Sequence, residues 1–167
     1  GKGSRFVVRL PLGQPAAGAD AIDGGAQAPQ ATARRLRVLV VDENVDAAQA
    51  LAAVLEAEGY PVRVRHDGAS ALALASEAEP PDVCLLDIGM PGMDGYELAR
   101  QLRALPAGPR LWLIATTGFG QGADKERAHA AGFDLHLTKP IDPQAVLLLL
   151  GKRAGRELSS PPALPQA

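Results

Sequence analysis

The sequence predicts a doubly wound α/β fold, in which helices cover both faces of a parallel sheet. Two short apolar runs, residues 38–41 and 83–86, are typical of strands buried on both faces. The first run ends in Asp42-Glu43 and the second in Asp87. Helical patterns alternate with these and further strand-like runs, which indicates right-handed βαβ crossovers.

Five strands and five helices fit the segment 37–150. We expect strands at residues 37–41, 61–66, 82–87, 111–116 and 134–138, and helices at residues 45–58, 68–78, 95–104, 123–131 and 142–150. Gly59 and Gly132 follow helical stretches as C-terminal stops. Asp142-Pro143 supplies an N-cap and a first-turn proline for the last helix.

The flanking segments have a different composition. Residues 13–35 are rich in Gly, Ala, Pro and Gln without periodicity, which predicts a flexible linker. Residues 151–167 hold three basic residues and end in a Ser- and Pro-containing stretch, so we expect a largely disordered tail.

Length and composition narrow the class of protein. The 167 residues suffice for one ordinary domain with flanks, and a net charge of −2 gives no long-range attraction to nucleic acid or anionic lipid. The single cysteine, Cys84, excludes an internal disulfide, and its strand position predicts an inert core residue. Without a signal peptide or a membrane-length apolar stretch, the sequence predicts a cytoplasmic polypeptide with no direct membrane contact.

The strand ends collect chemically active residues. The carboxyl ends of parallel strands meet at one edge of a sheet, where such folds bind ligands. Asp42, Glu43 and Asp87 would repel one another there unless a hard cation lay among them, and oxygen ligands suit Mg²⁺. Thr116 and Lys139 end two further strands. Acids, a hydroxyl and a lysine at one edge predict a site that handles a phosphoryl group.

Four motifs, in this order and spacing, resemble the receiver domain of two-component signalling systems. They are Val40-Val41-Asp42-Glu43-Asn44, Leu85-Leu86-Asp87-Ile88-Gly89-Met90-Pro91-Gly92-Met93-Asp94-Gly95, Ala115-Thr116-Thr117-Gly118 and Lys139-Pro140. The resemblance covers residues 36–150. It implies a flavodoxin-like, five-stranded parallel sheet in the order 2-1-3-4-5 with five helices.

The resemblance also implies a role for each residue. Asp87 would be the phosphoacceptor, since its carboxylate is ionised at neutral pH and needs no base. Mg²⁺ would be held by Asp42, Glu43, Asp87 and the backbone carbonyl of Gly89. Lys139 and the Thr116 hydroxyl would engage phosphoryl oxygens. The implied partner is the phosphohistidine domain of a histidine kinase or phosphotransfer protein, and the module would not be a stand-alone enzyme.

His136 departs from the family pattern. It lies three residues before Lys139, where receivers often carry Tyr or Phe as a rotameric switch coupled to Thr116. Either the histidine moves inward on phosphorylation or it lies at the surface, and we favour the surface. The Lys139-Pro140 bond is cis in many relatives, and the sequence leaves that open here.

The opening residues, 1–11, resemble the last glycine box and final strand of histidine-kinase ATPase domains, although the rest of such a domain is missing. Residues 1–12 would then be a kinase remnant, followed by the C-terminal receiver of a hybrid sensor kinase. Two alternatives stay open: a degenerate receiver that binds partners without phosphorylation, and a Mg²⁺-dependent aspartyl phosphohydrolase. The hydrolase is disfavoured because such enzymes need a second acid two residues after the nucleophile, where this chain has Gly89.

Overall fold

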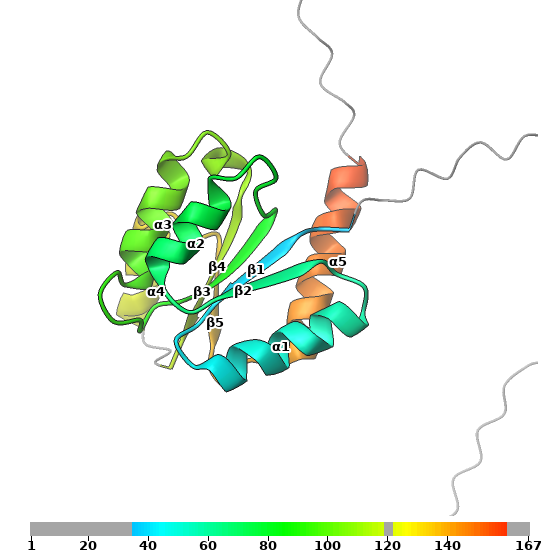
Figure 1. Cartoon of the computed structure of the whole chain (residues 1–167), viewed down its shortest axis with the longest axis horizontal. Helices are drawn as coiled ribbons and strands as arrows, with labels where there is room; N and C mark the ends of the chain where they lie inside the picture. Colours follow the sequence, from blue (N-terminus) through cyan, green and yellow to red (C-terminus); the bar gives the residue numbers. More distant parts are fainter. Residues whose placement is uncertain (1–34, 119–121, 160–167) are drawn as a thin grey trace, which may run out of the picture. The chain divides into compact units, whose positions relative to one another are not determined.

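A computed structural model describes residues 35–118 and 122–159, and it confirms the alternation of strands and helices (Figure 1). The elements in chain order are β1 Val38–Val41, α1 Val45–Ala57, β2 Val62–Arg65, α2 Gly68–Ala75, β3 Val83–Asp87, α3 Gly95–Ala104, the 3-10 turn η1 Gly108–Arg110, β4 Trp112–Thr117, α4 Gly122–Ala130, β5 Leu135–Thr138 and α5 Pro143–Ser159.

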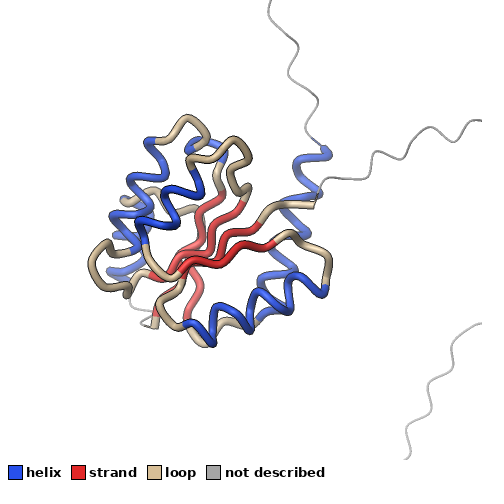
Figure 2. Tube along the Cα trace, viewed as in Figure 1, coloured by secondary structure: helices blue, strands red, loops and turns tan. Residues whose placement is uncertain are grey.

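All neighbouring strands pair in parallel, in the order β2-β1-β3-β4-β5. This is the strand order that the resemblance implied. Figure 2 shows the sheet between two layers of helices. Helices α1 and α5 cover one face, and α2, α3 and α4 cover the other (Figure 1). β3 is the central strand and pairs directly with β1, so the ends of these two strands are neighbours.

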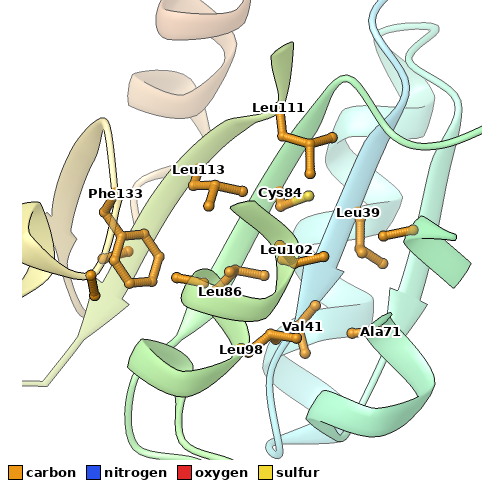
Figure 3. Close-up of a cluster of buried hydrophobic side chains, with 14 of the residues drawn as sticks. Leu39, Val41, Ala71, Cys84, Leu86, Leu98, Leu102, Leu111, Leu113 and Phe133 are labelled. Carbon is orange, nitrogen blue, oxygen red and sulfur yellow. The ribbon is translucent and has the colours of Figure 1, made fainter. Parts of the chain in front are cut away.

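Two hydrophobic cores lie on the two faces of the sheet, because successive strand side chains point to opposite faces. The first core packs against α2, α3 and α4 and takes Leu39, Val41, Cys84, Leu86, Leu113 and Ala115 from the strands (Figure 3). The second packs against α1 and α5 and takes Val38, Val40, Val83, Leu85 and Ile114. Cys84 is fully buried, and burial raises its pKa to about 12, which confirms an inert thiol.

The predicted stops at Gly59 and Gly132 and the predicted N-cap at Asp142 are confirmed, and three more helices begin at a side-chain cap. The side chains of Asn44, Asp67 and Asp94 accept hydrogen bonds from backbone amides in the first turns of α1, α2 and α3. Gly59 and Gly132 have φ of 84° and 99°, the left-handed geometry of a helix stop. Asp142 accepts from the Gln144 amide at 2.9 Å, just before Pro143 opens α5.

Helix α5 is longer than expected, because it continues to Ser159 where we predicted a disordered tail from residue 151. The stripe Val146, Leu150 and Ala154 explains the extension: Val146 and Leu150 are buried in the second core, and Ala154 packs against it one turn later. Conversely, α2 ends at Ala75, three residues early, where the Ser76 hydroxyl bonds the Leu72 carbonyl.

The predicted kinase remnant (1–12), nearly all of the predicted linker (13–35) and the last eight residues lie outside the described residues. Arg35 is the exception. Its guanidinium donates to the Glu58 carbonyl at 3.0 Å and lies 5.3 Å from the centre of the Tyr60 ring. The last residue of the predicted linker is therefore attached to the end of α1.

Candidate functional site

The two aspartates that end the central strands lie together at the carboxyl edge of the sheet. Asp42 follows β1, Asp87 ends β3, and each is only 5% exposed. The Lys139 ammonium lies 2.8 Å from Asp42 Oδ2 and 2.9 Å from Asp87 Oδ2. One cation thus neutralises parts of two buried acids, which reduces the cost of burying them.

The second oxygen of each carboxylate is held by its own loop. Asp42 Oδ1 accepts from the Asn44 amide at 2.9 Å, and Asp87 Oδ1 accepts from the Gly89 amide at 3.1 Å. His66, which follows β2, donates from Nδ1 to the Asp42 carbonyl at 2.9 Å. The carboxylates are therefore oriented before any ligand arrives.

The surroundings of Lys139 favour its protonated, positively charged form. Burial alone would lower its pKa, but hydrogen bonds and charge interactions with Asp42 and Asp87 outweigh that effect and raise the pKa above its ordinary value. The lysine is positively charged throughout the neutral range. The Lys139-Pro140 peptide bond, which the sequence left open, is cis.

The expected metal ligands are only partly assembled. In residues 35–118 and 122–159, no three carboxylate, histidine or cysteine side chains lie close enough together to hold a metal ion. Asp42 and Asp87 are brought together, whereas Glu43 and Gly89 are exposed beside them. The donors are nevertheless all oxygens, with two preoriented carboxylates, which suits a hard cation such as Mg²⁺.

The pocket beside Asp87 contains a different threonine from the one we predicted. It has a volume of about 430 Å³ and is lined by Asp87, Ile88, Gly89, Tyr96, Thr117, Gly118, Arg127 and Lys139. Thr116 pairs with Asp87 in the strand register but lines a second pocket on the α1 side. Alternation along β4 places the two threonines on opposite faces of the sheet, because Thr116 shares a face with Ile114 and Thr117 shares a face with Ala115.

His136 is not the surface residue that we favoured. It pairs with Ala115 in the register, on the face of the first core, and is partly buried. Its Nε2 is fully buried and has no hydrogen-bond partner in the part of the chain that the structure describes. The physical reason is that α4 and its C-terminal turn cover this face of β5, with Ala128, Ala131 and Phe133 in the core.

The loop between β3 and α3 shapes the other side of the site. Gly92 has φ of 76°, as expected for the Pro91-Gly92 turn. Gly95 opens α3 against the strand end: its amide donates to the Ile88 carbonyl at 3.2 Å, and a Cβ at this position would overlap the Asp87 carbonyl oxygen. Only glycine permits this close approach.

Residues 38–150, which include all the residues of this site, match the model of the response regulator receiver domain family. The chain belongs to that family. It is 39% identical over 151 residues to the virulence sensor protein BvgS of Bordetella bronchiseptica, a match that covers 85% of this chain and 12% of BvgS. It is also 39% identical over 106 residues to the response regulator PleD of Caulobacter vibrioides, covering 64% of this chain and 23% of PleD.

Solved receiver structures have the same fold. A receiver domain protein of Methanospirillum hungatei superposes with a TM-score of 0.67 at 27% identity, covering 75% of this chain and 98% of its own. The receiver domain of sensor histidine kinase PA1611 from Pseudomonas aeruginosa, solved with magnesium in the active-site cleft, gives 0.65 at 30% identity, covering 73% and 99%. The chain thus contains a two-component receiver domain.

None of the helices in the described ranges is long and apolar enough to cross a membrane.

Proposed function

We propose that this receiver domain accepts a phosphoryl group from a phosphohistidine onto Asp87. The observation that carries the proposal is the Lys139 ammonium between two buried carboxylates, beside an open pocket. An Asp87 oxygen attacks phosphorus, the bond from phosphorus to the imidazole nitrogen breaks, and the imidazole leaves with its electron pair. Asp87 needs no general base, because a carboxylate is the nucleophile.

The residues around Asp87 have distinct parts in this proposal. Lys139 neutralises charge on the transferring group and keeps Asp87 oriented. Thr117, in place of the predicted Thr116, donates its hydroxyl to a phosphoryl oxygen, since it lines the pocket that opens at Asp87.

Asp42, Glu43, Asp87 and the Gly89 carbonyl would hold Mg²⁺. When bound, the ion supplies charge stabilisation for the phosphoryl oxygens. A Glu43→Ala variant should bind Mg²⁺ more weakly by calorimetry, and equal affinity would remove Glu43 from the ligand set.

Incubation with acetyl phosphate and Mg²⁺, followed by intact-mass measurement, tests the main proposal. A labile mass gain that disappears in Asp87→Asn supports it. Normal labelling of the variant would refute Asp87 as the acceptor. Rapid turnover of the donor without a lasting adduct would favour the phosphohydrolase, and no reaction would favour the degenerate receiver.

We further propose that the phosphohistidine partner docks beside the site, over α1 and the start of α5. The second pocket, about 340 Å³, is lined mainly by apolar residues, including Ala50, Val54 and Ile141, and it also reaches Asp42 and Lys139. Its continuity with the site would place a partner's imidazole near Asp87.

An Ala50→Glu change should slow transfer from a phosphohistidine protein but leave labelling by acetyl phosphate unchanged. Equal slowing of both would place the docking surface elsewhere.

The chain is further proposed to be the receiver of a hybrid sensor kinase. Its match to BvgS covers 85% of the chain, so it extends to residues that precede the receiver domain. Residues 1–11 resemble the end of a kinase ATPase domain. Phosphoryl transfer to Asp87 from the parent kinase, reconstituted in full length, would test this context.

A further inference from the structure

Two residues of the pocket beside Asp87 have no part in the proposed transfer. Tyr96 lies in the first turn of α3, and Arg127 lies on α4. The Arg127 guanidinium carbon is 4.4 Å from the centre of the Tyr96 ring, a cation–π contact. The ring itself is 4% exposed and packs edge-on against Phe133, with centroids 6.4 Å apart, so it is a fixed platform. Arg127 is exposed to solvent.

The backbone of the pocket leaves room for an anion. Apart from its chain neighbours, a Cβ at Gly118 would have no described atom within 4 Å, and one at Gly89 would meet only the Asp87 carboxylate oxygens, at 3.8 and 3.9 Å. Neither position places a side chain in the pocket. A group attached to Asp87 therefore enters a space whose lining also includes Arg127.

The charge balance of the site makes a second cation useful. Lys139 is already shared between the carboxylates of Asp42 and Asp87. Phosphorylation replaces the single negative charge of the Asp87 carboxylate with a charge of about −1.5 to −2 on the phosphoryl oxygens. Arg127 is the one other cationic side chain that lines this pocket in the described part of the chain.

We infer that Arg127 is a phosphoryl-binding residue that exchanges the Tyr96 ring for the phosphoryl oxygens when Asp87 is phosphorylated. The inference rests on the proposed function. An exposed cation–π contact favours the stacked state by a factor of about two to five. A charge-assisted hydrogen bond to an anion is worth a factor of about ten to a hundred, so the phosphoryl group wins the competition.

The exchange would also report phosphorylation to α4. Ala128, beside Arg127, is buried in the first core but offers only one methyl group to it. Because this described anchor within α4 is so small, the helix should move at low cost when its arginine is drawn toward Asp87.

Beryllofluoride, which mimics the phosphoryl group, tests the inference in the full chain with Mg²⁺. Arg127→Ala should weaken its affinity by about tenfold or more and reduce the dependence on salt, while Arg127→Lys should restore part of the loss. Arg110→Ala is the matched control: it removes an equal, exposed charge from η1, outside this pocket, and should change affinity less than twofold.

The outcomes separate the two proposals. If the wild type binds beryllofluoride and Arg127→Ala binds equally well, the role of Arg127 is wrong while the receiver function stands. If the wild type does not bind it at all, both are overturned. If Arg127→Ala lowers the melting temperature without ligand but leaves the affinity unchanged, Arg127 only packs on Tyr96 and the inference fails.

Discussion

Lys139 Nζ lies 2.9 Å from Asp87 Oδ2, although β4 lies between β3, which ends at Asp87, and β5, which ends just before Lys139. The long lysine side chain crosses that strand end and also meets Asp42. The Asp87 carboxylate, the proposed acceptor, is thus buried and oriented by a cation before any phosphoryl group arrives. The stability of the fold is therefore linked to the chemistry of the site.

Replacing Lys139 by methionine should destabilise the protein by about 2 kcal/mol, because two buried carboxylates lose their cation. This loss of stability is smaller than the loss expected for a fully buried ion pair, since the lysine side chain is 28% exposed. Mg²⁺ should stabilise this variant more than the wild type, as it neutralises the same acids. Urea unfolding with and without Mg²⁺ measures both effects. The exposed Lys152→Met on α5 is the control, and an equal loss there would contradict the prediction.

Alkaline pH should destabilise the protein in two separate windows. Burial raises the pKa of Cys84 to about 12. The contribution of the neutral thiol to folding stability is therefore complete below the unfolded thiol pKa of about 8.5, and it is lost as the pH rises above that value. The pKa of Lys139 is also raised, but from about 10.4, so its contribution is lost only at higher pH.

Between pH 8 and pH 10, the free energy of unfolding of the wild type should therefore fall by about 2 kcal/mol more than that of a Cys84→Ala variant. Unfolding free energies at the two pH values test this. Parallel pH profiles for wild type and variant would show that the thiol is not the group responsible.

The two adjacent threonines should differ in effect. Thr117→Ala should slow labelling by acetyl phosphate by about tenfold, the loss of one hydrogen bond to a charged group in the transition state. Thr116→Ala is its control, because that residue lines the other pocket and should change the rate much less. Initial rates of mass gain distinguish them, and the opposite ranking would restore Thr116 to the site.

His136→Phe should stabilise the protein by about 1 kcal/mol, because the change removes a buried ring nitrogen that has no partner among the described residues. His129→Phe, at an exposed position on α4, should have little effect. Thermal unfolding measures both. Lower stability of His136→Phe would mean that the larger ring does not fit between β5 and α4.

Arg103 should be important for stability despite being partly exposed. Its guanidinium donates to the carbonyls of Gly132, Gly108 and Leu111 at 2.7–2.8 Å and to Asp134 at 2.7 Å. Arg103→Ala should cost about 2–3 kcal/mol in urea unfolding. Arg103→Lys should recover little, since an ammonium cannot match a planar fork that serves four acceptors. Arg100→Ala, on the exposed face of α3, is the control.

Apolar runs predicted the strands, and strand ends predicted Asp42, Asp87 and Lys139, because both depend on local sequence. The choice between Thr116 and Thr117 depended on a one-residue register, and one step reverses the face of the sheet. The surroundings of His136 depended on how α4 covers β5, which is a tertiary property. The same holds for Tyr96 and Arg127, which are far apart in sequence and meet only where α3 and α4 pack.

The close contact between Gly95 and the Asp87 carbonyl has a practical consequence. It holds the first turn of α3 close to the end of β3, which makes α3 a suitable reference helix within the domain. A pair of spin labels at exposed Arg100 on α3 and exposed His129 on α4 would therefore measure the displacement of α4 directly. Distance distributions recorded with and without beryllofluoride would then show how far α4 shifts relative to α3 in the signalling state.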